Sequence, residues 1–112
     1  MKKLAIALLA LSALTVGAQA DQVGKASYYS LTGRTASGSH VGAYTCAHRT
    51  LPFGSRVRVT NLKNNRSVVV VVNDRGPFTG GRVIDVSANA ADSLGMRSAG
   101  VAPVKVEVVS SR

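Results

Sequence analysis

The sequence of 112 residues lacks tryptophan and has only one cysteine and two histidines. Because Cys46 has no second cysteine to pair with, the chain cannot form the internal disulfides on which small secreted domains often depend. The usual fate of such a thiol is to be buried as a small apolar side chain. Two histidines without clustered carboxylates argue against a dedicated metal site, and no phosphate-binding loop or nucleotide fingerprint is present. We therefore expect neither a metal nor an organic cofactor.

Acidic residues are scarce as well: five Asp and Glu stand against fourteen Lys and Arg, a formal net charge of +9. In a cytosolic protein such a charge suggests a nucleic-acid partner. Outside the cytosol the polyanions are cell-wall polymers, lipopolysaccharide and membrane surfaces instead. The charge raises the local concentration near any of these without selecting one of them.

The first twenty residues predict export. Two lysines precede an uncharged run at residues 4–16, and an Ala-Gln-Ala sequence that a signal peptidase recognises ends at Ala20. The run is shorter than the roughly 20 residues of a membrane span, and no cysteine follows it for lipid attachment. We expect residues 1–20 to be a signal peptide. Residues 21–112 are expected to be a soluble product in the periplasm or cell envelope, without a stable membrane anchor or a nucleic-acid partner, and with a net charge near +7.

Strand patterns dominate the remaining residues, which suffice for one small core and leave no room for a second domain. Residues 57–60 alternate apolar and polar side chains. Residues 68–72 are five consecutive valines, typical of a strand that is covered on both faces. Residues 63–66 between them contain two asparagines, which tolerate the positive φ of a tight hairpin turn. Further strands are expected at 26–29 and 104–109.

One segment is typical of a helix. Residues 88–94 are mostly good helix formers, Ser87 precedes them at the capping position, and Gly95 follows where a left-handed C-cap belongs. The rest of the sequence indicates short strands and glycine-containing loops. Closure into a small, mainly β barrel with one short helix is the simplest solution, because it removes exposed strand edges.

Two carboxylates stand where chemistry is plausible. Asp74 ends the valine-rich strand before a Gly-Pro turn, and partial desolvation there raises a carboxyl pKa and suits a general acid. The alternative is a turn residue whose side chain bonds its own backbone. Asp85 lies between a short strand and the helix, where a structural role at the helix entrance is favoured.

His48 is a candidate base or ligand, although a packed structural histidine is the commoner outcome for an isolated one. If residues 46–48 are extended, Cys46 and His48 share a face, which allows a cysteine-peptidase interpretation. Nothing in the sequence marks the thiol as activated.

Six motifs carry a resemblance to a known family. They occur in order along the chain, at residues 26–29, 34–38, 47–54, 57–62, 72–78 and 82–87. Over about residues 24–109 the chain closely resembles the rare lipoprotein A (RlpA) family of endolytic peptidoglycan transglycosylases.

This resemblance implies a six-stranded double-psi β-barrel, the fold of expansins and family 45 endoglucanases. It implies action on peptidoglycan glycan strands, preferably those stripped of stem peptides. We expect the chain to be a monomer. The implied reaction cleaves the MurNAc–GlcNAc β-1,4 bond and leaves a 1,6-anhydromuramyl end. A carboxyl group protonates the leaving oxygen and a base helps the sugar's own 6-hydroxyl attack C1, so the spacing rules for hydrolases do not apply.

Position by position, Asp74 matches the family's essential aspartate and His48 its motif histidine. The resemblance also places five residues at the substrate: Tyr29, Arg34, Ser39, Arg75 and Asp85. Ser39 stands where the family usually has a glutamate, and loss of an acid–base group typically lowers a rate by about 10²–10⁴-fold. His40 and Asp85 are candidates to replace it. The departure motivates an alternative function, a non-catalytic expansin-like module that binds peptidoglycan or remodels the wall.

Overall fold

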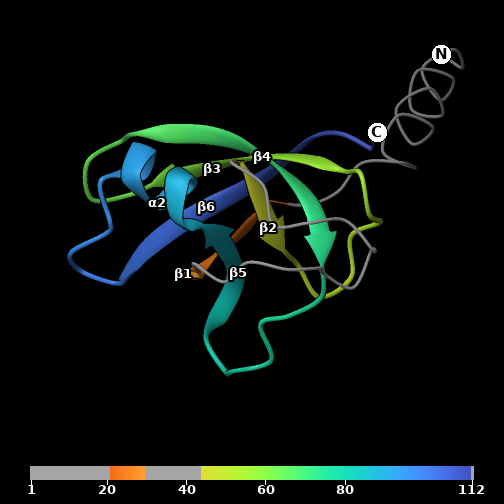
Figure 1. The fold of residues 1–112 in the computed structure, drawn as a ribbon, viewed down its shortest axis with the longest axis horizontal. Helices are drawn as coiled ribbons and strands as arrows, with labels where there is room; N and C mark the ends of the chain where they lie inside the picture. Colours follow the sequence, from red (N-terminus) through yellow and green to blue (C-terminus); the bar gives the residue numbers. More distant parts are fainter. Residues whose placement is uncertain (1–20, 30–43, 112) are drawn as a thin grey trace, which may run out of the picture.

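The structure is a computed structural model that describes residues 21–29 and 44–111. Its strands, in chain order, are β1 (Gln22–Tyr29), β2 (Thr45–Ala47), β3 (Arg56–Asn61), β4 (Ser67–Asp74), β5 (Arg82–Ser87) and β6 (Val101–Ser110). The helix α2 (Ala88–Leu94) connects β5 to β6 and lies against the strands (Figure 1). The signal peptide expected at residues 1–20 and the motif at 34–38 lie outside the described residues.

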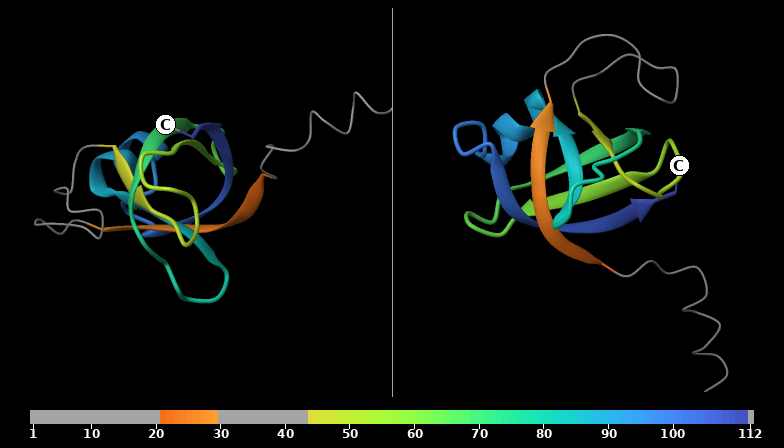
Figure 2. Two further views of the ribbon diagram at one scale, coloured as in Figure 1. Left: turned by 90° about the vertical axis from the view of Figure 1, so that its right-hand side faces the viewer. Right: turned by 90° about the horizontal axis from the view of Figure 1, so that it is seen from below.

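The six strands close into a barrel in the order β1-β5-β2-β4-β3-β6. Strand β1 runs parallel to β5 and β2 runs parallel to β4, while the other four neighbouring pairs are antiparallel. The left view of Figure 2 looks into the resulting ring. The closed, mainly β architecture expected from the sequence is confirmed, and closure pairs the strand edges that an open sheet would leave exposed.

The barrel interior is filled by branched apolar side chains. Alternate residues of a strand point to the same face, and accordingly Val57 and Val59 of β3 and Val70 and Val72 of β4 have no exposed surface. Each such side chain contributes about 1.5–3 kcal/mol when it leaves water. No helix in the described part of the chain is long and apolar enough to cross a bilayer.

The helix occupies the predicted residues, but Ser87 does not cap it as expected. Gly95 adopts a left-handed conformation with φ of 68°, as the C-cap prediction required. Ser87 stands at the N-cap position without a side-chain capping bond. Its hydroxyl instead accepts a hydrogen bond from the backbone N–H of Thr45 (3.3 Å). The side chain of Ser87 therefore joins strands rather than starting the helix.

The strands extend beyond the apolar patterns that predicted them. Strand β1 begins at Gln22 instead of residue 26, and β6 begins at Val101 instead of residue 104. These two strands pair with each other from Gln22 opposite Val106 to Ser27 opposite Val101. Backbone pairing sets their ends, and a polar or exposed side chain does not interrupt it.

Candidate active site

The outward side of β1, β5 and β2 carries polar side chains, some of them buried. The inward residues of these strands, such as Ala26, Cys46 and Ile84, are apolar and fully buried. The residues that alternate with them form what we call the polar strand face, which comprises Ser27, Tyr29, Thr45, Asp85 and Ser87. Strand pairing places Ser27 beside Asp85 and Tyr29 beside Ser87, so side chains from separate motifs meet on one surface.

Hydrogen bonds link the polar strand face across the strands. The Ser27 hydroxyl donates to Oδ1 of Asp85, and Nη1 of Arg82 lies 3.4 Å from the same hydroxyl. The hydroxyls of Tyr29 and Thr45 are 2.9 Å apart. Asp85 thus belongs to a strand and holds a neighbouring strand, whereas the sequence favoured a structural role at the helix entrance.

Asp74 and Asp85 flank one residue of β2. Ala47 is the register partner of Asp74 on one side and of Asp85 on the other. With neighbouring strands about 4.8 Å apart, the backbones of the two aspartates lie about 10 Å from each other. Their side chains come from two separate motifs, and the barrel brings them to the same region.

The charges of both carboxylates affect the pKa of the Tyr29 phenol. Burial is the main cause that raises the pKa of its phenol, and the hydrogen bond with Thr45 lowers it. Cys46 and the negative charges of Asp74 and Asp85 raise it further. The phenol therefore stays protonated at neutral pH and is available as a hydrogen-bond donor. Three of the residues predicted from the sequence (Tyr29, Asp74 and Asp85) are grouped in this way.

Asp74 also takes part in backbone bonding at the end of β4. Its Oδ1 accepts the N–H of Arg75 at 2.9 Å, and its carbonyl oxygen accepts the N–H of His48 at 3.1 Å. The side chain is half-buried. A bond to the adjacent backbone, which was the alternative for Asp74, is thus present, and the carboxyl still acts on Tyr29. The carboxyl can both accept the Arg75 N–H and affect Tyr29 because β4 ends at Asp74.

Cys46 does not form a catalytic pair with His48. Its side chain is fully buried in the barrel core. Burial, together with the charge of Asp85, raises the pKa of the thiol far above the neutral range. A thiol that remains protonated is a poor nucleophile, so the geometry does not support a cysteine-peptidase function.

The imidazole of His48 is held by three hydrogen bonds on another side of β2. Nδ1 lies 3.2 Å from the backbone nitrogens of both Thr50 and Leu51, and Nε2 lies 2.7 Å from Oε1 of Gln22. Since backbone N–H groups only donate, Nδ1 carries no proton and Nε2–H donates to Gln22. Burial lowers the pKa of His48, and the positive charges of Arg75 and Arg49 lower it further. The ring is therefore neutral at neutral pH.

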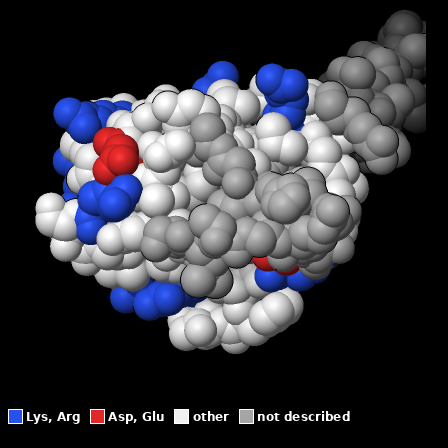
Figure 3. Space-filling model, viewed as in Figure 1, with Lys and Arg blue, Asp and Glu red and all other residues white. Residues whose placement is uncertain are grey.

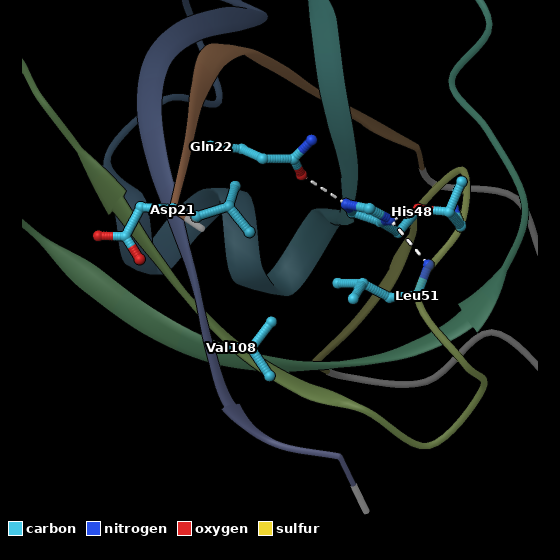
Figure 4. Close-up of a pocket in the computed structure, with 7 residues that line it drawn as sticks. Asp21, Gln22, His48, Leu51 and Val108 are labelled. Atoms are coloured by element: carbon cyan, nitrogen blue, oxygen red, sulfur yellow. Dashed lines mark hydrogen bonds between the residues drawn. The ribbon is translucent and has the colours of Figure 1, made fainter. Parts of the chain in front are cut away.

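Two cavities lie beside the bond between His48 and Gln22. One of about 230 Å³ is lined by these two residues with Asp21, Thr50, Leu51, Val106 and Val108 (Figure 4). The other, of about 210 Å³, also contains Arg49 and Val83 in its wall. Asp74 lines neither of them. His48 and Asp74 thus share a backbone hydrogen bond, but their side chains face different surroundings.

Two arginines connect the loop after β2 with the loop after β4. Arg75 donates from Nη1 to the carbonyls of Leu51 (2.8 Å) and His48 (3.2 Å), and its guanidinium lies 4.2 Å from the centre of the Phe53 ring. In the opposite direction, Arg49 donates to the carbonyl oxygens of Pro77 and Arg82. We call this reciprocal arrangement the arginine clasp. It places the Arg75 side chain, predicted to bind substrate, in contact with the protein's own backbone.

Arg34 and Ser39, the other residues predicted to bind substrate, lie outside the described residues, as does His40. Sequence reasoning missed Ser27, Arg82, Gln22 and Arg49. Ser27, Arg49 and Arg82 lie in motifs that carry the family resemblance, and Ser27 also alternates with Ala26 in a predicted strand, whereas Gln22 left no signal. Within residues 21–29 and 44–111 no group of three His, Cys, Asp or Glu side chains is arranged to hold a metal ion.

The closed six-stranded barrel with two parallel strand pairs defines the class of protein, a double-psi β-barrel. Solved structures with a similar fold include the following two. A Streptomyces papain inhibitor matches with a TM-score of 0.68 and 24% identity over 82% of this chain and 96% of that one. An expansin of Clavibacter michiganensis matches with a TM-score of 0.64 and 27% identity over 80% of this chain and 50% of that one.

Residues 21–106 match the model of the family described as lytic transglycolase, and this chain belongs to that family. A probable endolytic peptidoglycan transglycosylase RlpA of Synechocystis is 62% identical over 78 residues, which cover 68% of this chain and 24% of that protein. An endolytic peptidoglycan transglycosylase RlpA of Neisseria meningitidis serogroup A is 52% identical over 97 residues, covering 82% of this chain and 41% of that protein. The RlpA resemblance is confirmed. The chain spans less than half the length of these relatives.

Proposed function

We propose that this chain is an endolytic lytic transglycosylase that cleaves the MurNAc–GlcNAc β-1,4 bond of peptidoglycan glycan strands. One observation carries the proposal: Asp74 and Asp85 flank Ala47 and both act on Tyr29. Two carboxyl groups on either side of one strand residue can supply the acid and the base that cleavage of a glycosidic bond uses. The family and the relatives named as endolytic peptidoglycan transglycosylases support the same chemistry.

In this proposal Asp74 is the acid and Asp85 the base. Asp74 acts after it has taken up a proton, which its carboxyl then gives to the glycosidic oxygen as the bond from that oxygen to C1 of the muramyl residue breaks. The 6-hydroxyl oxygen of the same sugar bonds to C1, and Asp85 takes the hydroxyl proton. One proton enters and one leaves, so no water is consumed and the new end is a 1,6-anhydro sugar. Asp85 thereby takes the role of the family's glutamate, whose position is Ser39 in this chain.

The neighbouring residues have supporting roles in the proposed site. Ser27 and Arg82 hold the Asp85 side of the site, and the protonated Tyr29 phenol is a donor for a sugar oxygen. Arg34, Ser39 and Arg75 remain proposed substrate contacts. His48 holds the backbone beside Asp74, and proton transfer at Nδ1 would first require its bonds to Thr50 and Leu51 to open.

The charge of the protein fits an anionic glycan substrate. Strands without stem peptides expose the lactyl carboxylates of muramic acid, and residues 21–112 of this chain carry a net charge near +7. Basic side chains are spread around the face shown in Figure 3. We infer an exported monomer that works in the cell envelope and meets its substrate through this attraction, which weakens as salt rises.

Digestion of stem-peptide-free glycan strands with the purified chain tests the proposal. Mass spectrometry should detect 1,6-anhydromuramyl ends that accumulate with time, and Asp74→Asn should abolish them. Asn keeps the shape of the side chain and can still accept the Arg75 N–H, so loss of product points to the missing proton. Products with only reducing ends would show hydrolysis, and the absence of any product would remove the enzymatic proposal.

The second candidate is an expansin-like module that binds glycan without cutting it. The barrel matches a Clavibacter expansin variant solved in complex with cellohexaose, at 26% identity and a TM-score of 0.64 over 80% of this chain and 50% of that one. This candidate predicts salt-sensitive pull-down by insoluble peptidoglycan without any released sugar. Anhydromuramyl product from the wild-type chain, absent with Asp74→Asn, decides against it.

A further inference from the structure

The loop that joins β4 to β5 projects away from the barrel. It covers residues 75–81 and starts directly after Asp74. In the left view of Figure 2 it forms the teal extension below the ring. Its tip does not contribute to the barrel core, so packing of apolar side chains does not explain how it keeps its shape.

Hydrogen bonds hold the loop instead. Arg49 reaches across from the loop after β2 and donates to the carbonyl of Pro77 at 2.9 Å and to that of Arg82 at 2.8 Å. Arg75 donates in return to carbonyls of that other loop. At the end of the loop, the N–H of Arg82, the first residue of β5, donates to the carbonyl of Thr79 at 3.2 Å. Both ends of the loop are thereby tied before any ligand is present.

This fixed loop presents an aromatic ring to solvent. Phe78 is 78% exposed, more than any other large apolar side chain in the described residues. Its ring is near Gly76, where a Cβ atom would lie 3.6 Å from the ring edge. Leaving a phenylalanine in water forgoes about 1.5–3 kcal/mol that burial would supply. The ring is held in water on the loop that leaves Asp74, four residues along the chain from that carboxyl, where an apolar partner can cover it.

We propose that Phe78 is a sugar-binding residue, on which the apolar CH face of a pyranose ring of the glycan strand stacks next to the cleavage site. Pyranose rings carry C–H groups on their faces and hydroxyls on their edges, and aromatic rings pair with such apolar faces. The arginine clasp lowers the entropy lost on binding, because the loop is ordered beforehand. This inference rests on the proposed function, since it takes its ligand from the reaction at Asp74.

A binding assay without turnover tests this site. All variants carry Asp74→Asn, and the probe is a fluorescently labelled glycan strand stripped of stem peptides. Phe78→Ala should raise the dissociation constant about tenfold, at the lower end of what one aromatic stacking contact contributes to binding. Phe78→Tyr should stay within about twofold of the parent, because it keeps the ring. The matched control is Leu62→Ala, which removes another exposed apolar side chain and should also leave binding within twofold.

Three results would overturn the inference. Phe78→Ala could bind the strand as tightly as the parent, Phe78→Tyr could be as weak as Phe78→Ala, or the loss could appear with vesicles of anionic phospholipid and not with glycan. The last result would assign Phe78 to a membrane surface. The assay is independent of cleavage: if the wild-type chain releases no anhydro product while Phe78→Ala still loses binding, the proposed reaction fails and the sugar contact stands. If the wild-type chain cleaves and Phe78→Ala binds normally, the reverse holds.

Discussion

The polar strand face and the arginine clasp both contain many polar side chains, but they use them in opposite ways. On the strand face, hydroxyl groups from separate strands bond to one another and to Asp85, and the charges of Asp85 and of Asp74 outside this face raise the pKa of the Tyr29 phenol. In the clasp, the side chains of Arg49 and Arg75 donate to backbone carbonyls. The first arrangement gathers charge, and the second orders the backbone.

His48 and Asp74 show the difference most clearly. Their backbones are joined by a hydrogen bond of 3.1 Å, yet their side chains belong to different arrangements. The Asp74 carboxyl acts on Tyr29, whereas the His48 ring accepts bonds from the loop that the clasp holds. A backbone hydrogen bond between two motif residues therefore does not bring their side chains into the same site.

The largest expected effect is on the strand face. Asp85→Asn should lower the rate of anhydromuramyl release at least about 100-fold, as is typical when an acid–base group is lost. Asn keeps an oxygen that accepts from the Ser27 hydroxyl, so thermal unfolding should change little. Initial rates from mass spectrometry and a melting curve measure the two quantities.

Asp92→Asn is the matched control for charge. Asp92 lies on α2, is exposed and pairs with Arg97 at 3.1 Å, away from the proposed reaction. The Asp92→Asn variant should cleave glycan strands at the wild-type rate. If both aspartate variants lose the same activity, the strand face has no special role and net charge accounts for the loss.

The next effect is on stability, at His48. His48→Ala removes the acceptor of two backbone N–H groups, of which that of Leu51 is buried. It should lower the free energy of unfolding by about 1–3 kcal/mol, the cost of one buried unsatisfied group. Denaturant unfolding measures it. His48→Asn should recover part of the loss, because an Asn side chain can accept from a backbone N–H two residues on.

Activity of the same variants separates holding a loop from moving a proton. At a temperature where His48→Asn is fully folded, we expect its cleavage rate to stay within about tenfold of wild type, below the usual loss for an acid–base group. A drop as large as that of Asp74→Asn would instead make His48 a proton carrier, as the sequence resemblance suggested.

The smallest effect is a pH dependence of stability. Burial, Arg75 and Arg49 lower the pKa of His48 in the folded protein below its ordinary value of 6.5. The unfolded chain therefore binds the proton more readily, and the stabilisation is complete above pH 6.5 and lost as pH falls through the lower, folded pKa. Unfolding midpoints at pH 7.5 and pH 5.5 should differ more for wild type than for His48→Asn. Equal differences in the two proteins would contradict the assignment.

Much of the barrel was predictable because its signals are local. The alternation at residues 57–60, the valine run and the glycine after the helix each depend on the chemistry of adjacent residues, and β3, β4 and α2 appear where expected. Strand ends at Gln22 and Val101 were not predictable, because they depend on which strand lies alongside. The capping role predicted for Ser87 was wrong for the same reason, since its hydroxyl accepts a hydrogen bond from Thr45 of β2 instead.

The sequence by itself determined that this chain forms a closed β-barrel, where β3, β4 and α2 lie, and that Asp74 ends a valine-rich strand before a turn. Only the tertiary structure decided that Asp85 and Asp74 lie near Tyr29 and that the His48 ring bonds to Gln22. It also decided that Arg49 and Arg75 each donate to backbone carbonyls of another segment. The physical reason is that a strand pattern fixes which face a side chain takes, while the partner on that face comes from the register of a strand far away in the chain.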